Sequence, residues 1–196
     1  MSVLMIHQYP HLLEECCTLI NSEWPRSKTA RMRSLLASCD NLPTCLVLVI
    51  NDQVVGHSKI SAIPSIPTGC FVESVVIHSS LRGKGFGKQL MIKTEEFARS
   101  LGMQTVFLST HDQQGFYKKL GYAECAPVTI YGYYTTSSGH LSTKTCTKPN
   151  IPKTSSISAH NIPIPPPPPP PPPPPSQISI TLPSKNTKTF MRKDLI

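Results

Sequence analysis

A glycine-rich turn between a strand-like run and a helical pattern carries the strongest chemical signal in the sequence. The turn has the pattern R-x-x-G-x-G over residues 82–87 and follows the apolar run Val75–Ile77. Its two motif glycines allow the backbone to approach a ligand closely, and the N–H groups of residues 83–88 point outward at a helix N-terminus. With Lys84 and Lys88 beside them, these groups suit phosphate binding. The pattern is weak by itself, because a glycine-rich turn that binds nothing can have the same residues.

A second motif lies about 30 residues further along the chain. It begins with T-H-D-Q at residues 110–113 and continues with F-Y-K-K-L-G-Y at residues 116–122. Its tyrosine at position 117 lies in a short helical segment. The structural interpretation of this residue is an ordinary half-buried aromatic. The two motifs together give the order strand, phosphate turn, helix, strand, short helix, strand.

This order resembles the GNAT superfamily of acetyl-CoA-dependent N-acetyltransferases. In that family the pyrophosphate loop has the pattern R/Q-x-x-G-x-G/A, and a later helix carries F-Y-x-K-x-G-F/Y. The resemblance covers roughly residues 1–135. It implies an α/β (α+β) fold, in which helices flank a central mixed, mostly antiparallel twisted sheet with splayed middle strands. It also implies acetyl-CoA as the co-substrate.

The resemblance implies roles for individual residues as well. The strand before the loop would pair through its backbone with the pantetheine arm, and the loop would hold the pyrophosphate. The residues predicted to bind the cofactor are Val75, Val76, Ile77, Gly83, Lys84, Gly85, Phe86, Gly87, Lys88 and Gln113. Tyr117 matches the family tyrosine that can protonate the leaving thiolate. The Asn that is usual seven residues before it is Thr110 in this chain.

The reaction implied by this family is aminolysis of a thioester by a neutral amine. An α-amino group has a pKa of about 8 and a lysine about 10.4, so an N-terminal amine is easier to deprotonate near neutral pH. Strong base catalysis is then optional, and positioning supplies much of the rate. Glu73, on the strand before the loop, and His111 are the candidate bases, directly or through a water. A structural role is the alternative for each.

A basic segment between the first two helical patterns is the candidate acceptor site. Residues 24–33 (W-P-R-S-K-T-A-R-M-R) contain four cations, no acid and the only tryptophan of the chain. Arg26 and Arg31 can each bind a carboxylate through two hydrogen bonds, so the segment predicts an acidic acceptor. The predicted acceptor-binding residues are Trp24, Arg26, Ser27, Lys28, Thr29, Ala30 and Arg31. A solvated basic turn with a buried Trp24 is the alternative.

Periodicity and turn residues place these motifs on a series of short elements. Helices are expected over 11–20, 31–38, 85–101 and 114–120. Strands are expected over 3–8, 44–50, 54–63, 71–77, 105–109 and 122–134. The run at 44–50 is almost entirely apolar (T-C-L-V-L-V-I), which indicates a strand buried on both faces.

The C-terminal part differs in composition from the first 135 residues. Residues 136–185 are rich in Ser, Thr, Lys and Pro and lack periodicity, which predicts a disordered insertion. Within it, Pro165–Pro175 predicts a polyproline II rod of roughly 34 Å, at about 3.1 Å per residue. An unbroken proline run without flanking Arg suits profilin better than SH3 domains, with an inert spacer as the alternative. Residues 186–196 regain apolar character and are a possible strand that returns to the core.

Charge and cysteine usage exclude several classes of function. Residues 1–135 hold 12 Lys+Arg and 10 Asp+Glu, whereas residues 136–196 hold 7 and 1, so the net charge of +8 says little about nucleic acid. The seven cysteines show no metal-ligand or disulfide-framework spacing. No run is apolar enough for a membrane span, and no signal-peptide pattern opens the chain. We expect a cytosolic protein without a metal, nucleic-acid or membrane partner.

A wider set of motifs extends the resemblance to the GNAT enzymes of animals that acetylate the N-terminus of actin. These motifs are W-P-R-S-x-T-x-R, Gly56-His57, L-R-G-K-G-F-G, T-H-D-Q before F-Y, and the proline-rich insertion. The resemblance implies post-translational acetylation of processed actin that begins with Asp or Glu, with Pro165–Pro175 recruiting profilin–actin. Two alternatives remain open: a GNAT enzyme for a lysine or small-molecule amine, and a polyproline adaptor whose GNAT core is inactive.

Overall fold

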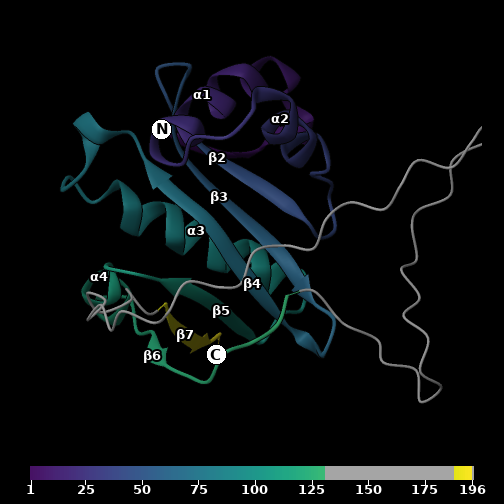
Figure 1. The fold of residues 1–196 in the computed structure, drawn as a ribbon, viewed down its shortest axis with the longest axis vertical. Coiled ribbons are helices and arrows are strands. Elements are labelled where there is room, and N and C mark those ends of the chain that lie inside the picture. Colours follow the sequence, from purple (N-terminus) through teal and green to yellow (C-terminus); the bar gives the residue numbers. More distant parts are fainter. Residues whose placement is uncertain (131–187, 196) are drawn as a thin grey trace, which may run out of the picture. The chain divides into compact units, whose positions relative to one another are not determined.

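A seven-stranded sheet with flanking helices is seen in the computed structural model, which describes residues 1–130 and 188–195 (Figure 1). The strand order is β1-β2-β3-β4-β5-β7-β6. The strands are β1 (Ser2–Met5), β2 (Thr44–Ile50), β3 (Gln53–Ile63), β4 (Ile66–Ile77), β5 (Thr105–Thr110), β6 (Ala123–Glu124) and β7 (Thr189–Asp194). The helices are α1 (Leu13–Glu23), α2 (Lys28–Leu36), α3 (Phe86–Ser100) and α4 (Gln114–Lys119), with 3₁₀ turns at Ile6–Gln8, Pro10–Leu12 and Ser79–Leu81.

The pairing pattern divides the sheet at its middle. Neighbouring strands are antiparallel except β4 and β5, which run parallel and pair from Gly69 opposite Thr105 to Val72 opposite Leu108. Beyond these residues β4 continues along β3 to Ile77, and β5 continues along β7, but the two no longer pair with each other. We call this unpaired region the split. The expected mixed, mostly antiparallel sheet with splayed middle strands is thereby confirmed.

β2 contributes to a core on each face of the sheet. Val47 and Val49 pack with α1 and α2, whereas Leu46 and Leu48 pack with α3. Successive side chains of a strand point to opposite faces, so a strand that is covered on both faces needs apolar residues throughout. The strand expected over 44–50 is confirmed for this reason.

α2 begins three residues earlier than its periodicity indicated. The hydroxyl of Ser27 accepts a hydrogen bond from the backbone N–H of Ala30 (3.2 Å) and caps the helix. The helix therefore occupies Lys28–Leu36 instead of 31–38. As a consequence, the second half of the predicted acceptor segment lies on the first turn of a helix and not in a loop.

The expectation of a long strand over 122–134 is wrong in its described part. Only Ala123–Glu124 is a strand, and it pairs with β7. β7 pairs with β5 over six residues. It therefore occupies the edge of β5 with which a strand over 122–134 would otherwise pair. The proline-rich residues 136–185, with the run 165–175, lie outside the described residues.

Candidate active site

The glycine-rich loop leads into α3 with its backbone exposed. Gly83 and Gly85 have φ angles of +76° and +86°, and no heavy atom beyond the adjoining residues lies within 4 Å of the position that a Cβ would take at either residue. Only glycine adopts such φ angles without strain. Arg82 anchors the loop, since its guanidinium donates to the carbonyl of Ile77 (2.9 Å) and to the Glu23 carboxylate (2.6 Å). An open cradle at the N-terminus of a 15-residue helix fits a phosphate group.

The loop, the end of β4 and α4 meet at Gly87. A Cβ at Gly87 would lie 3.4 Å from the ring of Phe116 on α4 and 3.8 Å from the Cγ1 atom of Ile77 on β4. Val75–Ile77 belong to the stretch of β4 that borders the split. The tertiary structure therefore brings the two sequence motifs to the same place, beside the split.

Tyr117 lies on α4 in a group of aromatic rings. Its ring packs edge-on against those of Phe116 and Tyr122, with centroids 5.0 Å and 5.7 Å apart. Burial raises the pKa of its phenol to about 12, so the phenol keeps its proton near neutral pH. It can therefore act as an acid but not as a base. The backbone N–H of Gln113 donates to the Thr110 hydroxyl (3.0 Å), which orders the turn before α4.

The two predicted bases have different surroundings. The carboxylate of Glu73 pairs with the Lys59 ammonium (2.8 Å) and accepts a hydrogen bond from the Ser61 hydroxyl (3.3 Å). A proton taken up by Glu73 would weaken this ion pair. His111 is exposed in the turn between β5 and α4, where its backbone carbonyl accepts a hydrogen bond from Gln114 (2.9 Å). Of the two side chains, only that of Glu73 is held in a defined orientation by these contacts.

Hydrogen bonds from Asn21 and Arg31 hold the predicted acceptor segment in place. The Arg31 guanidinium donates to the side-chain oxygen of Asn21 (3.0 Å) and to the carbonyl of Trp24 (2.8 Å). The Asn21 amide in turn donates to the carbonyl of Arg26 (3.0 Å). Arg31 is only 9% exposed, so it holds the loop and does not project as a free cation toward a carboxylate.

The other residues of this segment are more accessible. Trp24 is 43% exposed and is not the buried anchor of the alternative interpretation. Arg26 is exposed as well, whereas Lys28 pairs with Glu14 (2.6 Å) on the surface. Ser27, Thr29 and Ala30 lie at the start of α2, where backbone N–H groups and the helix dipole favour a negative charge.

A residue to which the sequence assigned no role lies next to the β4 strand. His57 on β3 is 1% exposed, and its Nδ1 atom is 2.8 Å from the carbonyl oxygen of Ser74 on β4. Ser74 has a φ angle of +55°, which is unusual for a residue with a side chain. The Gly56-His57 pair was visible in the sequence, but this contact depends on how β3 and β4 pair.

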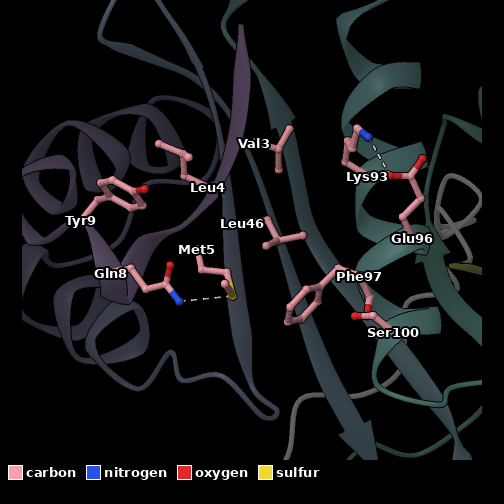
Figure 2. Close-up of a pocket in the computed structure, with 10 residues that line it drawn as sticks. All are labelled: Val3, Leu4, Met5, Gln8, Tyr9, Leu46, Lys93, Glu96, Phe97 and Ser100. Atoms are coloured by element: carbon pink, nitrogen blue, oxygen red, sulfur yellow. Dashed lines mark hydrogen bonds and ion pairs between the residues drawn. The ribbon is translucent and has the colours of Figure 1, made fainter.

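A partly apolar hollow of about 360 Å³ lies between β1, the 3₁₀ turn after it and α3 (Figure 2). Val3, Met5 and Phe97 line it, together with the Lys93–Glu96 ion pair (2.7 Å). None of the predicted cofactor or acceptor residues lines this hollow. Within residues 1–130 and 188–195, no three His, Cys, Asp or Glu residues are grouped as metal ligands, and no helix is long and apolar enough to cross a membrane.

Comparisons with known proteins agree with the two motifs. The sequence is 43% identical over 126 residues to N-alpha-acetyltransferase 80 of Mus musculus, over 61% of this chain and 40% of that protein. The chain thus spans less than half of the length of that relative.

Solved structures share the fold. An aminoglycoside 6′-N-acetyltransferase complexed with coenzyme A matches with a TM-score of 0.61 at 15% identity, over 100% of this chain and 98% of that chain. The aminoglycoside 6′-N-acetyltransferase from Enterococcus faecium matches with a TM-score of 0.55 at 20% identity, over 64% and 86%. The model of the acetyltransferase (GNAT) family matches residues 11–122, which include both motifs and more than half of the 196 residues. The chain belongs to the GNAT family of acetyltransferases.

Proposed function

We propose that this protein transfers an acetyl group from acetyl-CoA to the α-amino group of a protein that begins with Asp or Glu. The observation that carries the proposal is the meeting of the two motifs, where Gly87 of the phosphate loop lies against Phe116, next to Tyr117, beside the split. The mouse relative, which is named an N-alpha-acetyltransferase, supports an N-terminal amine as the acceptor.

In this proposal each part of the site has one task. The N–H groups of residues 83–88 bind the pyrophosphate, and the backbone of Val75–Ile77 pairs with the pantetheine arm as a neighbouring strand would. Acetyl-CoA supplies the thioester carbonyl that the amine attacks. Gln113, exposed before α4, contacts the cofactor beyond the loop. Tyr117, which stays protonated near neutral pH, donates its proton to the leaving thiolate.

Trp24 and Arg26 are the proposed contacts to the acidic terminus. Both are exposed, and Arg26 makes no ion pair within residues 1–130 and 188–195, so its guanidinium is available for a carboxylate. Arg31 acts indirectly, by holding the loop that carries them. Glu73 or His111 accepts the proton of the amine, directly or through a water. A weak base suffices, because an α-amino group has a pKa of about 8.

The proposed acceptor in the cell is processed actin, and the proposed partner is profilin, bound through Pro165–Pro175. Both follow from the motif resemblance, and the proline run suits an aromatic groove. A profilin–actin complex held by this run would raise the effective concentration of the actin N-terminus at the site. The cytosol is the compartment proposed for this reaction.

Acetyl transfer to two peptides of equal length tests the proposal. One begins with Asp-Asp-Asp, and the other begins with Ala and has its charges removed. We expect a strong preference for the acidic peptide, and the preference should fall when Arg26 is replaced by Gln. Equal transfer to both peptides, or transfer only to lysine side chains or small amines, would overturn it. Measurable acetyl-CoA binding without transfer to any amine or to profilin–actin would favour the adaptor alternative.

A further inference from the structure

Glu73 is the first residue of β4 inside the split. The pairing of β4 with β5 ends where Val72 lies opposite Leu108, and Glu73 follows directly in the chain. On its other side β4 remains paired with β3, where Lys59 lies opposite Glu73. Glu73 is therefore placed where the two middle strands begin to separate, just before the backbone with which the pantetheine arm is proposed to pair.

The side chains of Glu73 and Lys59 lie on the face of the sheet that α1 and α2 cover. Lys59 lies opposite Glu73 of β4 and opposite Cys45 of β2, and residues directly opposite each other on antiparallel strands project to the same face. Cys45 belongs to the apolar core that α1 and α2 form with this face. Because α2 carries the second half of the predicted acceptor segment, Glu73 and that segment lie on the same side of the sheet.

Only one of the two carboxylate oxygens of Glu73 is occupied by the described residues. Its Oε1 atom lies 2.8 Å from the Lys59 ammonium and accepts a hydrogen bond from the Ser61 hydroxyl over 3.3 Å. Its Oε2 atom accepts no hydrogen bond within residues 1–130 and 188–195 and is not among the buried atoms there. The side chains of Lys59 and Glu73 are 20% and 29% exposed, so the ion pair is partly shielded from water. The carboxylate thus presents one oxygen, Oε2, to a ligand.

We propose that Lys59 is a positioning residue for acetyl transfer, which holds the Oε1 atom of Glu73 so that the Oε2 atom takes the proton from the acceptor amine. The inference rests on the proposed acetyl transfer and adds to it a residue and the oxygen that receives the proton. Lys59 touches neither the acceptor nor the thioester in this role and acts only through the orientation of Glu73.

The proton moves after the amine has begun to react. The lone pair of the neutral amine forms a bond to the thioester carbon, and the carbonyl π electrons move to the oxygen. The nitrogen then carries a positive charge and is acidic, so a carboxylate is a sufficient base although it is a weak one. Once Oε2 has taken the proton, the carbonyl re-forms, the C–S bond breaks and the thiolate takes the proton of Tyr117. Exchange with water restores both side chains.

Removal of the Lys59 ammonium should slow the chemical step. In Lys59→Met the carboxylate of Glu73 remains present but is free to turn. A general base contributes about 100-fold or more, and a displacement of about 1 Å costs about 100-fold, so we expect kcat to fall by about 10- to 100-fold. The KM for acetyl-CoA should change little. Lys59→Arg keeps a cation with N–H donors and should retain kcat within about threefold.

The double variant Lys59→Met/Glu73→Gln separates positioning from a general loss of structure. Lys59→Met leaves the Glu73 charge without its cation and should lower the midpoint of urea unfolding, whereas the double variant carries neither charge and should regain that midpoint. Its kcat should stay within about threefold of that of Glu73→Gln, because Lys59 acts only through Glu73. Losses that multiply in the double variant, a kcat that returns together with stability, or an equal loss in Lys59→Arg would overturn the proposal.

Lys93→Met is the control for the loss of a lysine from an ion pair. Lys93 lies 2.7 Å from Glu96 on α3, where both side chains are about half exposed. Exposed pairs contribute little to stability, so this variant should change neither kcat nor the urea midpoint measurably. A loss in Lys59→Met no greater than that in Lys93→Met would contradict a role for Lys59.

The comparison does not depend on which amine accepts the acetyl group. Each variant is measured with the Asp-Asp-Asp peptide and with any other amine that the unchanged protein acetylates, and the same fold-decrease is expected for each, since Glu73 acts on the nitrogen that all acceptors share. Equal use of acidic and uncharged peptides would overturn the proposed acceptor and still decide the role of Lys59. An unchanged kcat in Glu73→Gln would overturn this inference alone, whereas no transfer to any amine by the unchanged protein would overturn both.

Discussion

The ammonium group of Lys193 lies 2.6 Å from the Glu95 carboxylate and joins β7, near the end of the described chain, to the middle of α3. The same carboxylate accepts a hydrogen bond from the Tyr122 hydroxyl (3.0 Å), and the ring of Tyr122 packs against that of Tyr117. Glu95 is 6% exposed, so these two partners take the place of water around its carboxylate. β7 is thereby connected to the candidate catalytic tyrosine through a partly buried network.

Lys193→Met should destabilise the protein more than the loss of a surface ion pair usually does. The substitution leaves the Glu95 charge without its cation, which we expect to lower the free energy of unfolding by about 2 to 3 kcal/mol. Urea unfolding measures the change. Arg192→Met on the same strand is the control, because Arg192 is more than half exposed and its contact with Asp194 is 3.9 Å long. A loss no greater than that of the control would contradict the assigned role of the network.

Gly85→Ala should weaken acetyl-CoA binding through backbone strain alone. There is room for the added methyl group, but a positive φ angle costs a side-chain-bearing residue about 1 to 2 kcal/mol. The free loop of the variant should relax from this angle, and binding must restore it, which corresponds to a loss of about tenfold in affinity. Isothermal titration measures this affinity. Gly102→Ala is the matched control, since Gly102 has a φ angle of +78° and equal space but follows the other end of α3. Equal effects on affinity would argue against a phosphate site at the loop.

Arg26 and Arg31 should differ in their effects although they lie in one basic segment. Arg26→Gln should raise the KM for the acidic peptide about tenfold, through loss of one exposed charge-assisted contact. Arg31→Gln should instead lower the free energy of unfolding by about 1 to 3 kcal/mol, because the side-chain oxygen of Asn21 and the carbonyl of Trp24 lose their donor. Peptide kinetics and urea unfolding of both variants give the two readouts. An unchanged KM in stable Arg26→Gln protein would remove this residue from the acceptor site.

The stability of the protein should fall as the pH is lowered from about 6.5 toward 4. In this window the unfolded state protonates His57 whereas the folded state does not, because burial lowers its folded pKa to about 4. The unfolded state thus binds one more proton, and the free energy of unfolding decreases by about 1.4 kcal/mol for each unit of pH. Urea unfolding between pH 4.5 and 7.5 measures this slope. His57→Asn should reduce the slope by the amount that corresponds to about one bound proton. An unchanged slope would refute the claim that the buried imidazole of His57 is neutral.

Tyr117→Phe should lower kcat with little effect on acetyl-CoA binding. Loss of a positioned general acid lowers kcat by about 100-fold or more when the leaving group needs the proton. A thiolate needs the proton less, so we expect a decrease of about 10- to 100-fold in kcat. The raised pKa of about 12 means that Tyr117 should cause no break in the pH profile of kcat below about pH 10. A variant with unchanged kcat would assign the ring to packing against Tyr122 and Phe116.

Several elements follow from sequence patterns because their causes are local. β2 coincides with the strand expected over 44–50, since both of its faces are covered. α3 begins directly after Gly85, the motif glycine at which the preceding turn ends. The early start of α2 also has a local cause, the Ser27 cap, which periodicity alone does not detect. The short β6 has a distant cause, because β7 takes the place beside β5.

By itself, the sequence determined which chemical groups are present and in what order. It supplies the glycine-rich loop, the tyrosine helix and a basic segment, each specified by residues within a few positions of one another. Only the tertiary structure decided that Arg31 holds a loop, that β7 and α3 are joined through Lys193 and Glu95, and that His57 holds Ser74. These contacts join residues 7, 98 and 17 positions apart. They depend on burial and strand register, which are set by packing of the whole domain and not by local pattern.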